Sequence, residues 1–185
     1  SYNTANVIFL RIGERYEGEK AKLNNVTISN VYAEVPAGKP DAGYEYEGPV
    51  EDLPRNISPA SITGLPGQYV TNVTLKNITI VYPGGGNPNY AKVGTDAKSL
   101  NAIPEMPKAY PEFSQFKELP AWGFYIRHAK GITFDNVTLT AEKPDYRPAI
   151  VLDDVHGGDL ENVTINDPDK KKNEIVVFQS TDIKK

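Results

Sequence analysis

A 17-residue pattern occurs twice in the chain, as GFYIRHAKGITFDNVTL (123–139) and as AIVLDDVHGGDLENVTI (149–165), 26 positions apart. The two stretches align without a gap, and like residues fall on like: Phe124 on Ile150, Ile126 on Leu152, Gly131 on Gly157, Phe134 on Leu160 and Asn136 on Asn162. A further step of 26 predicts Val176 beneath Ile150 and Phe178 beneath Leu152. A repeat of about 20 to 30 residues that consists of short alternating segments and turns is typical of a solenoid.

Related segments extend the pattern along the chain. They share alternating apolar residues, the period of a β-strand, and they are VIFLRIG (7–13), NNVTISNV (24–31), TNVTLKNI (71–78) and IVVFQST (175–181). Three short strands with their turns fill one repeat, so we predict an all-β fold, a right-handed parallel β-helix of about five coils stacked ~4.8 Å apart. The coils should begin near residues 6, 57, 121, 149 and 174. Each inward aliphatic or aromatic side chain contributes roughly 1.5–3 kcal/mol on burial.

Asparagine ends the strand pattern at four equivalent places, Asn30, Asn77, Asn136 and Asn162. Asparagine tolerates left-handed backbone angles, and its amide can bond the asparagine of the next coil, so we expect a corner at each place. Asn-x-Ser/Thr sequences, which are acceptors of N-glycosylation, begin at six asparagines, namely Asn25, Asn56, Asn72, Asn77, Asn136 and Asn162. Because the repeated Asn-Val/Ile-Thr unit generates most of these sequences, the structural explanation is favoured.

We expect a single domain over residues 1–185, with two insertions that break the repeat at about 35–56 and 82–120. Both are rich in glycine, proline and aromatic residues and are interpreted as loops. Their aromatic side chains are too numerous for a solvated linker, and these are Tyr44, Tyr46, Tyr90, Tyr110, Phe113 and Phe116. We therefore predict that both loops fold onto the coils.

Composition argues against several classes of partner and chemistry. The net charge is −4 and no basic block occurs, so no nucleic acid is expected as a partner. No apolar run approaches the ~20 residues of a membrane span, so no membrane is expected either. Cysteine is absent and the two histidines have no carboxylate cluster at ligand spacing, so we expect no metal and no cofactor. The opening SYNTANVIFL lacks the features of a secretory signal, which indicates a cytoplasmic protein or a missing natural N-terminus.

Side chains between the inward ones should form an outward polar column. The column consists of Arg11, a polar residue near Thr63, Arg127, Asp153 and Gln179. It suits a sugar-binding surface, but an ion pair between Arg127 and Asp153 that stitches two coils together is the favoured interpretation.

Two further pairs of residues are candidates for a catalytic role, but the sequence supports neither. Asp153 and Asp154 are neighbours on one strand, so they should face opposite ways instead of converging on one substrate atom. His128 aligns with Asp154, and a hydrogen-bonded pair across one coil spacing is favoured there. We therefore assign no catalytic residue to this chain.

Several longer strings carry a resemblance to a known family. They are IFLRIGER (8–15), VPAGKPDAGYEYEGP (35–49), SPASITGLPGQYVTNVTLKNITIVYPGG (58–85), AYPEFSQFKELPAWGFYIRHAKGITFDNV (109–137) and RPAIVLDDV (147–155). Together they resemble glycoside hydrolase family 28, most closely its bacterial polygalacturonase-like and rhamnogalacturonan-active branch. The resemblance implies a right-handed parallel β-helix and hydrolysis of pectin with inversion. Because members of the family are commonly exported, it also implies a periplasmic or extracellular location.

The chain departs from the family at its active site. The pattern N-T-D-G-x-D, then D-D and G-H-G, is not found, and the R-I-K motif is only echoed by Arg11-Ile12-Gly13. The resemblance therefore implies the C-terminal coils of such an enzyme, inactive alone, with the acid and base upstream. It further implies Arg11 as a contact to a pectin or rhamnogalacturonan polysaccharide, with Tyr125 and Arg127 as further candidates.

The alternative is a non-catalytic β-helix that binds polysaccharide or mediates assembly. Under either hypothesis the first coil, around NVIFLRIG (6–13), has no capping element before it. Its apolar residues and strand edges would be exposed, so self-association through this end is expected.

Overall fold

The computed structural model describes residues 4, 6–16, 18, 20–37, 56–89, 93–116, 118–169 and 174–185. Its strands are β1 (Phe9–Arg11), β2 (Asn24–Glu34), β3 (Ala60–Thr63), β4 (Val70–Tyr82), β5 (Phe124–Ala141), β6 (Ile150–Asp159), β7 (Val163–Asn166), β8 (Ile175–Phe178) and β9 (Thr181–Lys184). Two short helices, α1 (Ala97–Asn101) and the 3₁₀-helix η1 (Phe113–Phe116), precede β5. Within the described ranges no helix is both long and apolar enough to cross a bilayer. The fold is thus mostly β-sheet.

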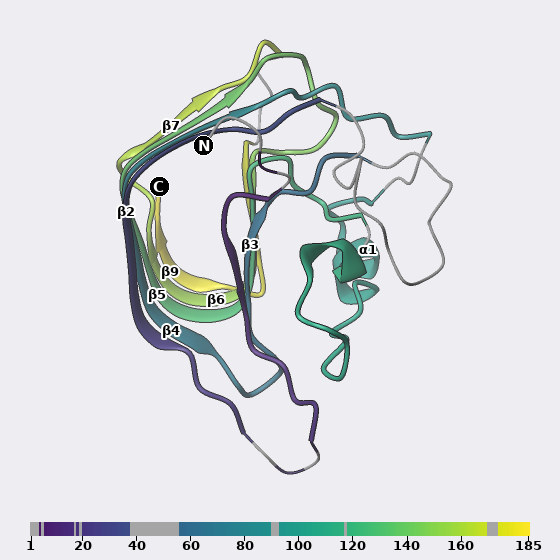
Figure 1. The fold of residues 1–185 in the computed structure, drawn as a ribbon, viewed down its shortest axis with the longest axis vertical. Helices are drawn as coiled ribbons and strands as arrows, with labels where there is room; N and C mark the ends of the chain where they lie inside the picture. Colours follow the sequence, from purple (N-terminus) through teal and green to yellow (C-terminus); the bar gives the residue numbers. More distant parts are fainter. Residues whose placement is uncertain are drawn as a thin grey trace.

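The strands form one sheet in which every pairing between the named strands is parallel. β3 lies between β1 and β5, and β6 lies between β5 and β8. β4 lies between β2 and the second half of β5, whose end pairs with β7, while β9 pairs with the end of β6. Figure 1 shows that the strands curl around a common interior like half of a barrel.

The register of the sheet confirms the alignment of the two 17-residue stretches. Phe124 is the Cα partner of Ile150, and Ile126 is the Cα partner of Leu152. On the other side of β5, Ile62 of β3 pairs with Ile126, so the inward column continues toward the N-terminus. Equivalent residues of the repeat therefore lie side by side.

We call each set of strands stacked on the next a level. At the last level, where β8 pairs with β6, the predicted step of 26 residues is one residue too long. Val177, and not Phe178, is the partner of Leu152, and Val176 is likewise displaced from Ile150. A shift of one residue moves every side chain of a strand to the other face. Here it turns Phe178 outward, where it packs against a second apolar cluster.

The main core consists of the inward side chains that the repeat predicts. Phe124, Ile126 and Phe134 of β5 are at most 1% exposed, and the rings of Phe124 and Phe134 meet edge to face at 5.0 Å between centroids. Tyr82 is also buried, and its hydroxyl donates to the carbonyl oxygen of Gly123 at 2.9 Å. Because a buried hydroxyl without a partner would be costly, this bond explains how a tyrosine is tolerated in the core.

The strands bend where the backbone takes left-handed angles. Three of the predicted asparagine corners are present, at Asn30 (φ 58°), Asn77 (φ 53°) and Asn136 (φ 58°). Their amides form a ladder in which Asn136 donates to Asn77 and Asn77 donates to Asn30, each at 3.0 Å. The corner predicted at Asn162 is wrong, because this residue lies in a turn before β7 without a left-handed φ.

The outer face of β3, β5 and β6 is covered by residues 93–116 and 118–121, which we call the cover, and Figure 1 shows α1 on the outer side of β3. Leu100, Ile103 and Phe116 of this cover are buried against Tyr125 and Val151 of the sheet. The prediction that the second insertion folds onto the strands is therefore confirmed for these residues.

The absence of helix from this insertion was predicted and is wrong. Asp96 caps α1 by accepting a hydrogen bond from the Ser99 backbone at 3.1 Å, and a helix of five residues is too short to show apolar periodicity. Tyr110 is 63% exposed, contrary to the expectation of packing. Residues 38–55, with Tyr44 and Tyr46, and Tyr90 lie outside the described residues, so the first insertion stays a prediction.

Candidate functional site

The predicted outward column exists as a row of Cα partners, which we call the outer row. It consists of Arg11, Thr63, Arg127, Asp153 and Phe178. The expectation of Gln179 as its last member is wrong for the reason given above, since the final step is one residue shorter. Polar side chains are therefore lined up on the outer face, as the repeat predicts, but the cover lies over them.

Arg127 is held from three sides. Its Nε lies 3.1 Å from Oδ2 of Asp153, and its Nη2 lies 2.8 Å from Oε1 of Glu105. Its Nη1 donates to the carbonyl oxygen of Ile103 at 2.8 Å. The Nε contact is electrostatic, because that N–H has no hydrogen-bond partner of good geometry among the described residues. The predicted ion pair between Arg127 and Asp153 is confirmed, and Arg127 also joins the sheet to the cover.

Tyr125 lies beside this ion pair and is fully buried. Its hydroxyl donates to Oδ2 of Asp153 at 3.3 Å. Burial raises the pKa of Tyr125 well above its usual value, so the phenol stays protonated and acts as a donor. Burial also raises the pKa of Asp153, although the neighbouring Arg127 opposes this shift. With the cover in place, neither Tyr125 nor Arg127 presents a side chain to a polysaccharide, and their predicted contact role stays a prediction.

Arg11 is bound to the cover from the opposite end of the outer row. Its guanidinium donates to the carbonyl oxygens of Met106 and, at 3.0 Å, of Tyr110. It also lies over the ring of Phe116, 5.0 Å from the centroid. Burial lowers the pKa of Arg11 from its usual value, but an arginine so far from neutral pH keeps its charge. Its role in substrate contact stays a prediction, and its visible role is to hold the cover.

A second group of polar side chains lies at the bend that follows the outer row. We call it the bend cluster, and it consists of Tyr69, Glu105, His128, Lys130, Asp154 and His156. His128 has a φ of 50° and Asp154 a φ of 55°, so the strands turn at these two residues. Simple alternation would direct Asp154 into the core, but at the bend its side chain is partly exposed and pairs with His128, whereas Asp153 pairs with Arg127.

His128 bridges two carboxylates. Its Nδ1 lies 2.6 Å from Oδ2 of Asp154, which confirms the predicted pair, and its Nε2 lies 3.0 Å from Oε1 of Glu105. Burial alone would lower the pKa of His128, but the hydrogen bonds to Glu105 and Asp154 outweigh it and raise the pKa above 6.5. The second carboxylate belongs to the cover, so this histidine connects cover and sheet.

The carboxylate of Asp154 accepts three hydrogen bonds. Besides His128, Nε2 of His156 lies 2.8 Å from its Oδ1, and the hydroxyl of Tyr69 donates to the same oxygen at 3.4 Å. Burial works to raise the pKa of Asp154, but the three hydrogen bonds prevail and lower it. The carboxylate is therefore ionised over the whole neutral range. An acid held ionised by such donors is a poor proton donor for the hydrolysis of a glycosidic bond.

The solvent side of the bend cluster combines an aromatic ring with basic groups. Nζ of Lys130 lies 4.0 Å from the centroid of the Tyr69 ring, and the ring of His156 meets Tyr69 edge to face at 5.7 Å. Lys130 is exposed, whereas Tyr69 and His156 are half-buried. Such a surface can contact the apolar face of a sugar ring and a carboxylate at once. Within the described part of the chain, no group of three or more metal-ligating side chains could hold a metal ion.

Sequence reasoning missed three members of this cluster. Lys130 could have been found, because it is the partner of His156 in the repeat. Tyr69 could have been found, because Val70 is the partner of Ala129 and Tyr69 therefore falls next to His128 in the repeat. Glu105 could not have been found, since it lies in the insertion between α1 and η1, where the repeat gives no register.

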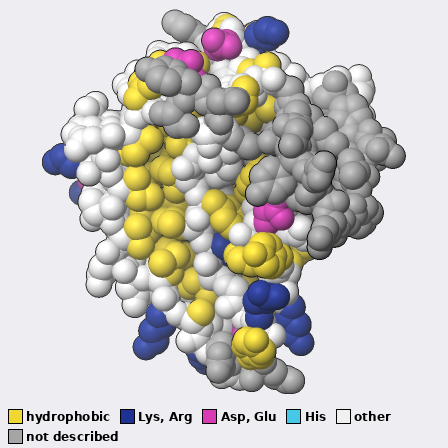
Figure 2. Space-filling model, viewed as in Figure 1, with side chains coloured by type: hydrophobic (Ala, Val, Ile, Leu, Met, Phe, Trp, Pro, Cys, Tyr) yellow, Lys and Arg dark blue, Asp and Glu magenta, His cyan; other side chains and the backbone are white. Residues whose placement is uncertain are grey.

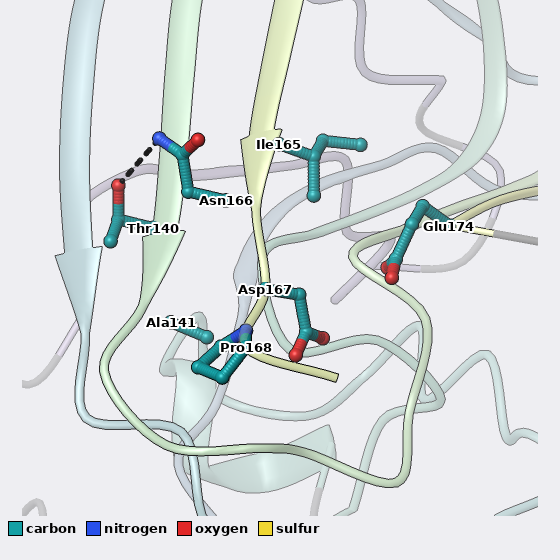
Figure 3. Close-up of a pocket in the computed structure, with 7 residues that line it drawn as sticks. All are labelled: Thr140, Ala141, Ile165, Asn166, Asp167, Pro168 and Glu174. Carbon is teal, nitrogen blue, oxygen red and sulfur yellow. Dashed lines mark hydrogen bonds between the residues drawn. The ribbon is translucent and has the colours of Figure 1, made fainter. Parts of the chain in front are cut away.

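A hollow of about 530 Å³ lies away from both groups, at the ends of β5 and β7. Figure 3 shows its lining, in which Nδ2 of Asn166 donates to Oγ1 of Thr140 at 3.2 Å. Asp167 and Glu174 complete the polar part of the lining. None of the residues predicted to contact a substrate lines it. The hollow is therefore not part of the candidate site.

Comparisons with known proteins found no match. The chain matches no family model, no curated protein and no solved structure. The case for a function therefore depends on the residues and their geometry.

Proposed function

We propose that the curled parallel sheet is a right-handed parallel β-helix of about five coils, and that it forms the C-terminal part of a pectin-degrading glycoside hydrolase. The in-register stacking of the outer row from Arg11 to Asp153 is the observation that carries this proposal. Regular stacking of that kind is typical of a solenoid, and the extended surface of a solenoid suits a linear polymer. The strings that resemble glycoside hydrolase family 28 support the choice of polymer.

In this proposal the chain contacts a polysaccharide and supplies no hydrolytic acid. Asp153 is engaged by Arg127 and Tyr125, and Asp154 by two histidines, so neither is poised beside a bond to be cleaved. Inverting hydrolysis needs two carboxyl groups ~6.5–9.5 Å apart across the scissile bond, and these would come from another part of the enzyme. A periplasmic or extracellular location goes with this role, because pectin lies outside the cell.

The contact surface we propose is the exposed side of the bend cluster. Lys130 offers a cation to a uronate carboxylate, and Tyr69 offers the edge of an aromatic ring to a sugar. Arg11 keeps the role that the resemblance gives it only if the cover yields, since its guanidinium is bound to Tyr110 and Met106.

Binding to a charged and a neutral polymer tests this surface. Affinity electrophoresis through gels that contain polygalacturonate should retard the chain, and salt should weaken the retardation. Lys130→Gln should reduce it several-fold. Lys76→Gln is the matched control, because Lys76 is also exposed but pairs with Asp135 on another face. Equal loss in the two variants, or no retardation of the unaltered chain, would contradict the assignment of the surface.

Release of reducing sugar tests the catalytic half of the proposal. The isolated chain, incubated with polygalacturonate or rhamnogalacturonan, should release none above a heat-treated sample. Turnover that survives purification and disappears in Asp153→Asn or Asp154→Asn would overturn the proposal that the acids lie elsewhere.

A second candidate function, an assembly module, is favoured by the open end of the sheet at β2. Figure 2 shows a band of hydrophobic side chains over the region around which the strands curl in Figure 1. Val26, Ile28 and Val31 of β2 are only partly buried, and among the described strands β2 pairs with β4 alone. Light scattering at rising protein concentration distinguishes the two functions. A mass that grows with concentration, and that Val26→Lys returns to the monomer value, supports assembly. A monomer at all concentrations contradicts the assembly function.

A further inference from the structure

We propose that His128 is a proton-operated latch that fastens the cover (residues 93–116 and 118–121) to the bend of the sheet, so that the cover loosens when the imidazolium loses its proton. This proposal does not depend on the proposed function. It rests on the position of one ring between a carboxylate of the sheet and a carboxylate of the cover.

The geometry of the bridge requires a charged ring. Both nitrogens of His128 face carboxylate oxygens, with Nδ1 2.6 Å from Asp154 and Nε2 3.0 Å from Glu105. An ionised carboxylate only accepts hydrogen bonds, and a neutral imidazole has one N–H and one lone pair. A neutral ring can therefore satisfy one of the two acids and must turn a lone pair toward the other. Only the imidazolium donates to both.

The groups around His128 favour the charged form on balance. Glu105 from the cover and Asp154 from β6 bring two negative charges into contact, and Asp154 is shared with His156. Arg127 on the same strand opposes the charge, because its Nη2 lies on the same oxygen of Glu105. The ring of Tyr69 packs edge to face against His128 at 6.3 Å and carries no charge at neutral pH. Asp153 adds a further acid beyond Arg127 and lies near enough to His128 to feel its charge.

The other attachments of the cover do not change with pH in the neutral range. Arg11 and Arg127 donate to carbonyl oxygens of the cover, and the backbone N–H of Glu14 donates to the carbonyl oxygen of Pro107 at 2.8 Å. Asn56 also donates two hydrogen bonds to the carboxylate of Glu118, and Arg147 donates to the carbonyl oxygen of Leu119. Apolar contacts of Leu100, Ile103 and Phe116 add to these attachments. Because the chain has only two histidines, and His156 does not contact the cover in the described interactions, His128 is the group that can make the cover respond near neutral pH.

The sign of the effect follows from linkage. The pKa of His128 in the closed state lies above its ordinary value of 6.5, so the closed cover binds the proton more tightly than the open cover does. The latch is therefore fully fastened below about pH 6.5 and weakens as the pH rises through the raised pKa. One titrating group can change the opening equilibrium by at most about tenfold per pH unit across that window.

Loosening the cover would change what the outer row presents. Tyr125, Arg127 and Asp153 form a polar group that is at most 8% exposed while the cover is closed. Opening would bring the group to the surface without any movement of the strands that carry it. The latch thus controls access to the outer face.

Hydrogen exchange at the cover tests the latch in the unaltered chain. The amides of Ile103 and Ala109 bond within the cover and that of Glu14 bonds to it, so their protection reports closure. Between pH 5.5 and 8.5, after correction for the intrinsic rate, their opening constants should rise with pH, by no more than about tenfold per pH unit. The opening constants of the Ile126 and Leu152 amides in the sheet should not change with pH. Opening constants at the cover that do not vary with pH would overturn the proposal.

Two variants and one control assign the effect to His128. Glu105→Gln keeps the shape of the acceptor but removes its charge, and should flatten the dependence on pH while the cover stays closed through Arg127. His128→Gln should raise the opening constants at low pH to the value that the unaltered chain has at high pH, and should remove their dependence on pH. His156→Gln is the matched control, because it removes the other histidine and should leave the dependence intact. If His128→Gln fails to fold, nitrogen-15 imidazole shifts of the unaltered chain decide: one-site protonation of His128 at pH 6 would contradict the bridge.

Discussion

The two sides of the sheet are built by different rules. The inner side repeats, and Ile62, Ile126 and Leu152 follow one another as Cα partners at equivalent places in the sequence. The outer side is completed by an insertion that has no counterpart in the other levels, and it is held by ionic bonds to Glu105 and by apolar contacts. The comparison teaches that the repeat builds the scaffold, whereas the insertion decides which of the repeated polar positions is accessible.

The largest expected effect is on the inner side. Phe124→Ala should lower the free energy of unfolding by about 3–5 kcal/mol, because it empties a site that is fully buried and packed against Phe134. Val177→Ala should cost less than about 1 kcal/mol, since that side chain is 36% exposed at the last level. Unfolding in urea measures both. Similar costs in the two variants would break the distinction between a stacked core and an open end.

A smaller effect is expected on the outer side. Asp153→Asn should lower the free energy of unfolding by about 1–3 kcal/mol, because Arg127 keeps Glu105 and the carbonyl oxygen of Ile103 but loses one buried charge partner. Arg127→Met combined with Asp153→Leu should recover part of the loss, as apolar residues need no charge partner. A double-mutant cycle with no coupling would show that the observed ion pair does not stitch the levels together.

A third prediction concerns the asparagines at the bends of the strands. Asn77→Ala should cost about 1–2 kcal/mol, because alanine pays for a φ of 53° and the ladder to Asn30 and Asn136 is broken. Asn162→Ala is the matched control and should change stability by less than about 0.5 kcal/mol, since Asn162 has no left-handed backbone and lies exposed in a turn. If the two variants lose equal stability in thermal unfolding, Asn162 forms a corner like Asn77, contrary to the structure.

The smallest effect concerns Asp154 in acid. The folded state lowers its pKa, so its contribution to stability is present above the ordinary value of 3.8 and is lost as the pH falls through the lowered pKa. Urea unfolding between pH 5 and 2 should therefore show a loss that Asp154→Asn does not share. Parallel curves for the two proteins would mean that His128, His156 and Tyr69 do not stabilise the ionised form.

Much of the inner side could be predicted from the sequence, and the reason is physical. Alternating apolar residues fix the face of a strand, and a constant step between repeats fixes which residues become neighbours, so the pairs of β5 with β6 were predicted correctly. The same reasoning gave the contacts of Arg127 with Asp153 and of His128 with Asp154.

Prediction failed where the repeat changes or stops. The last step is one residue shorter, which put Phe178 rather than Gln179 next to Asp153. Glu105 lies in an insertion without a repeat, so the third partner that joins Arg127 and His128 had no signal in the sequence. A non-repeating segment finds its place by packing and charge, which a count of residues does not reveal.

Cross-linking between levels tests the central claim, that parallel strands stack in register. The chain has no native cysteine, so paired cysteines can be introduced at Ser29, Lys76 and Asp135, which are successive Cα partners on β2, β4 and β5. A disulfide needs Cα atoms about 4.4–6.8 Å apart, and adjacent strands meet this while strands two levels apart do not. Mass spectrometry after mild oxidation should find a bridge in Ser29→Cys/Lys76→Cys and in Lys76→Cys/Asp135→Cys but none within Ser29→Cys/Asp135→Cys. A bridge in the last pair, or in neither of the first two, would contradict the account.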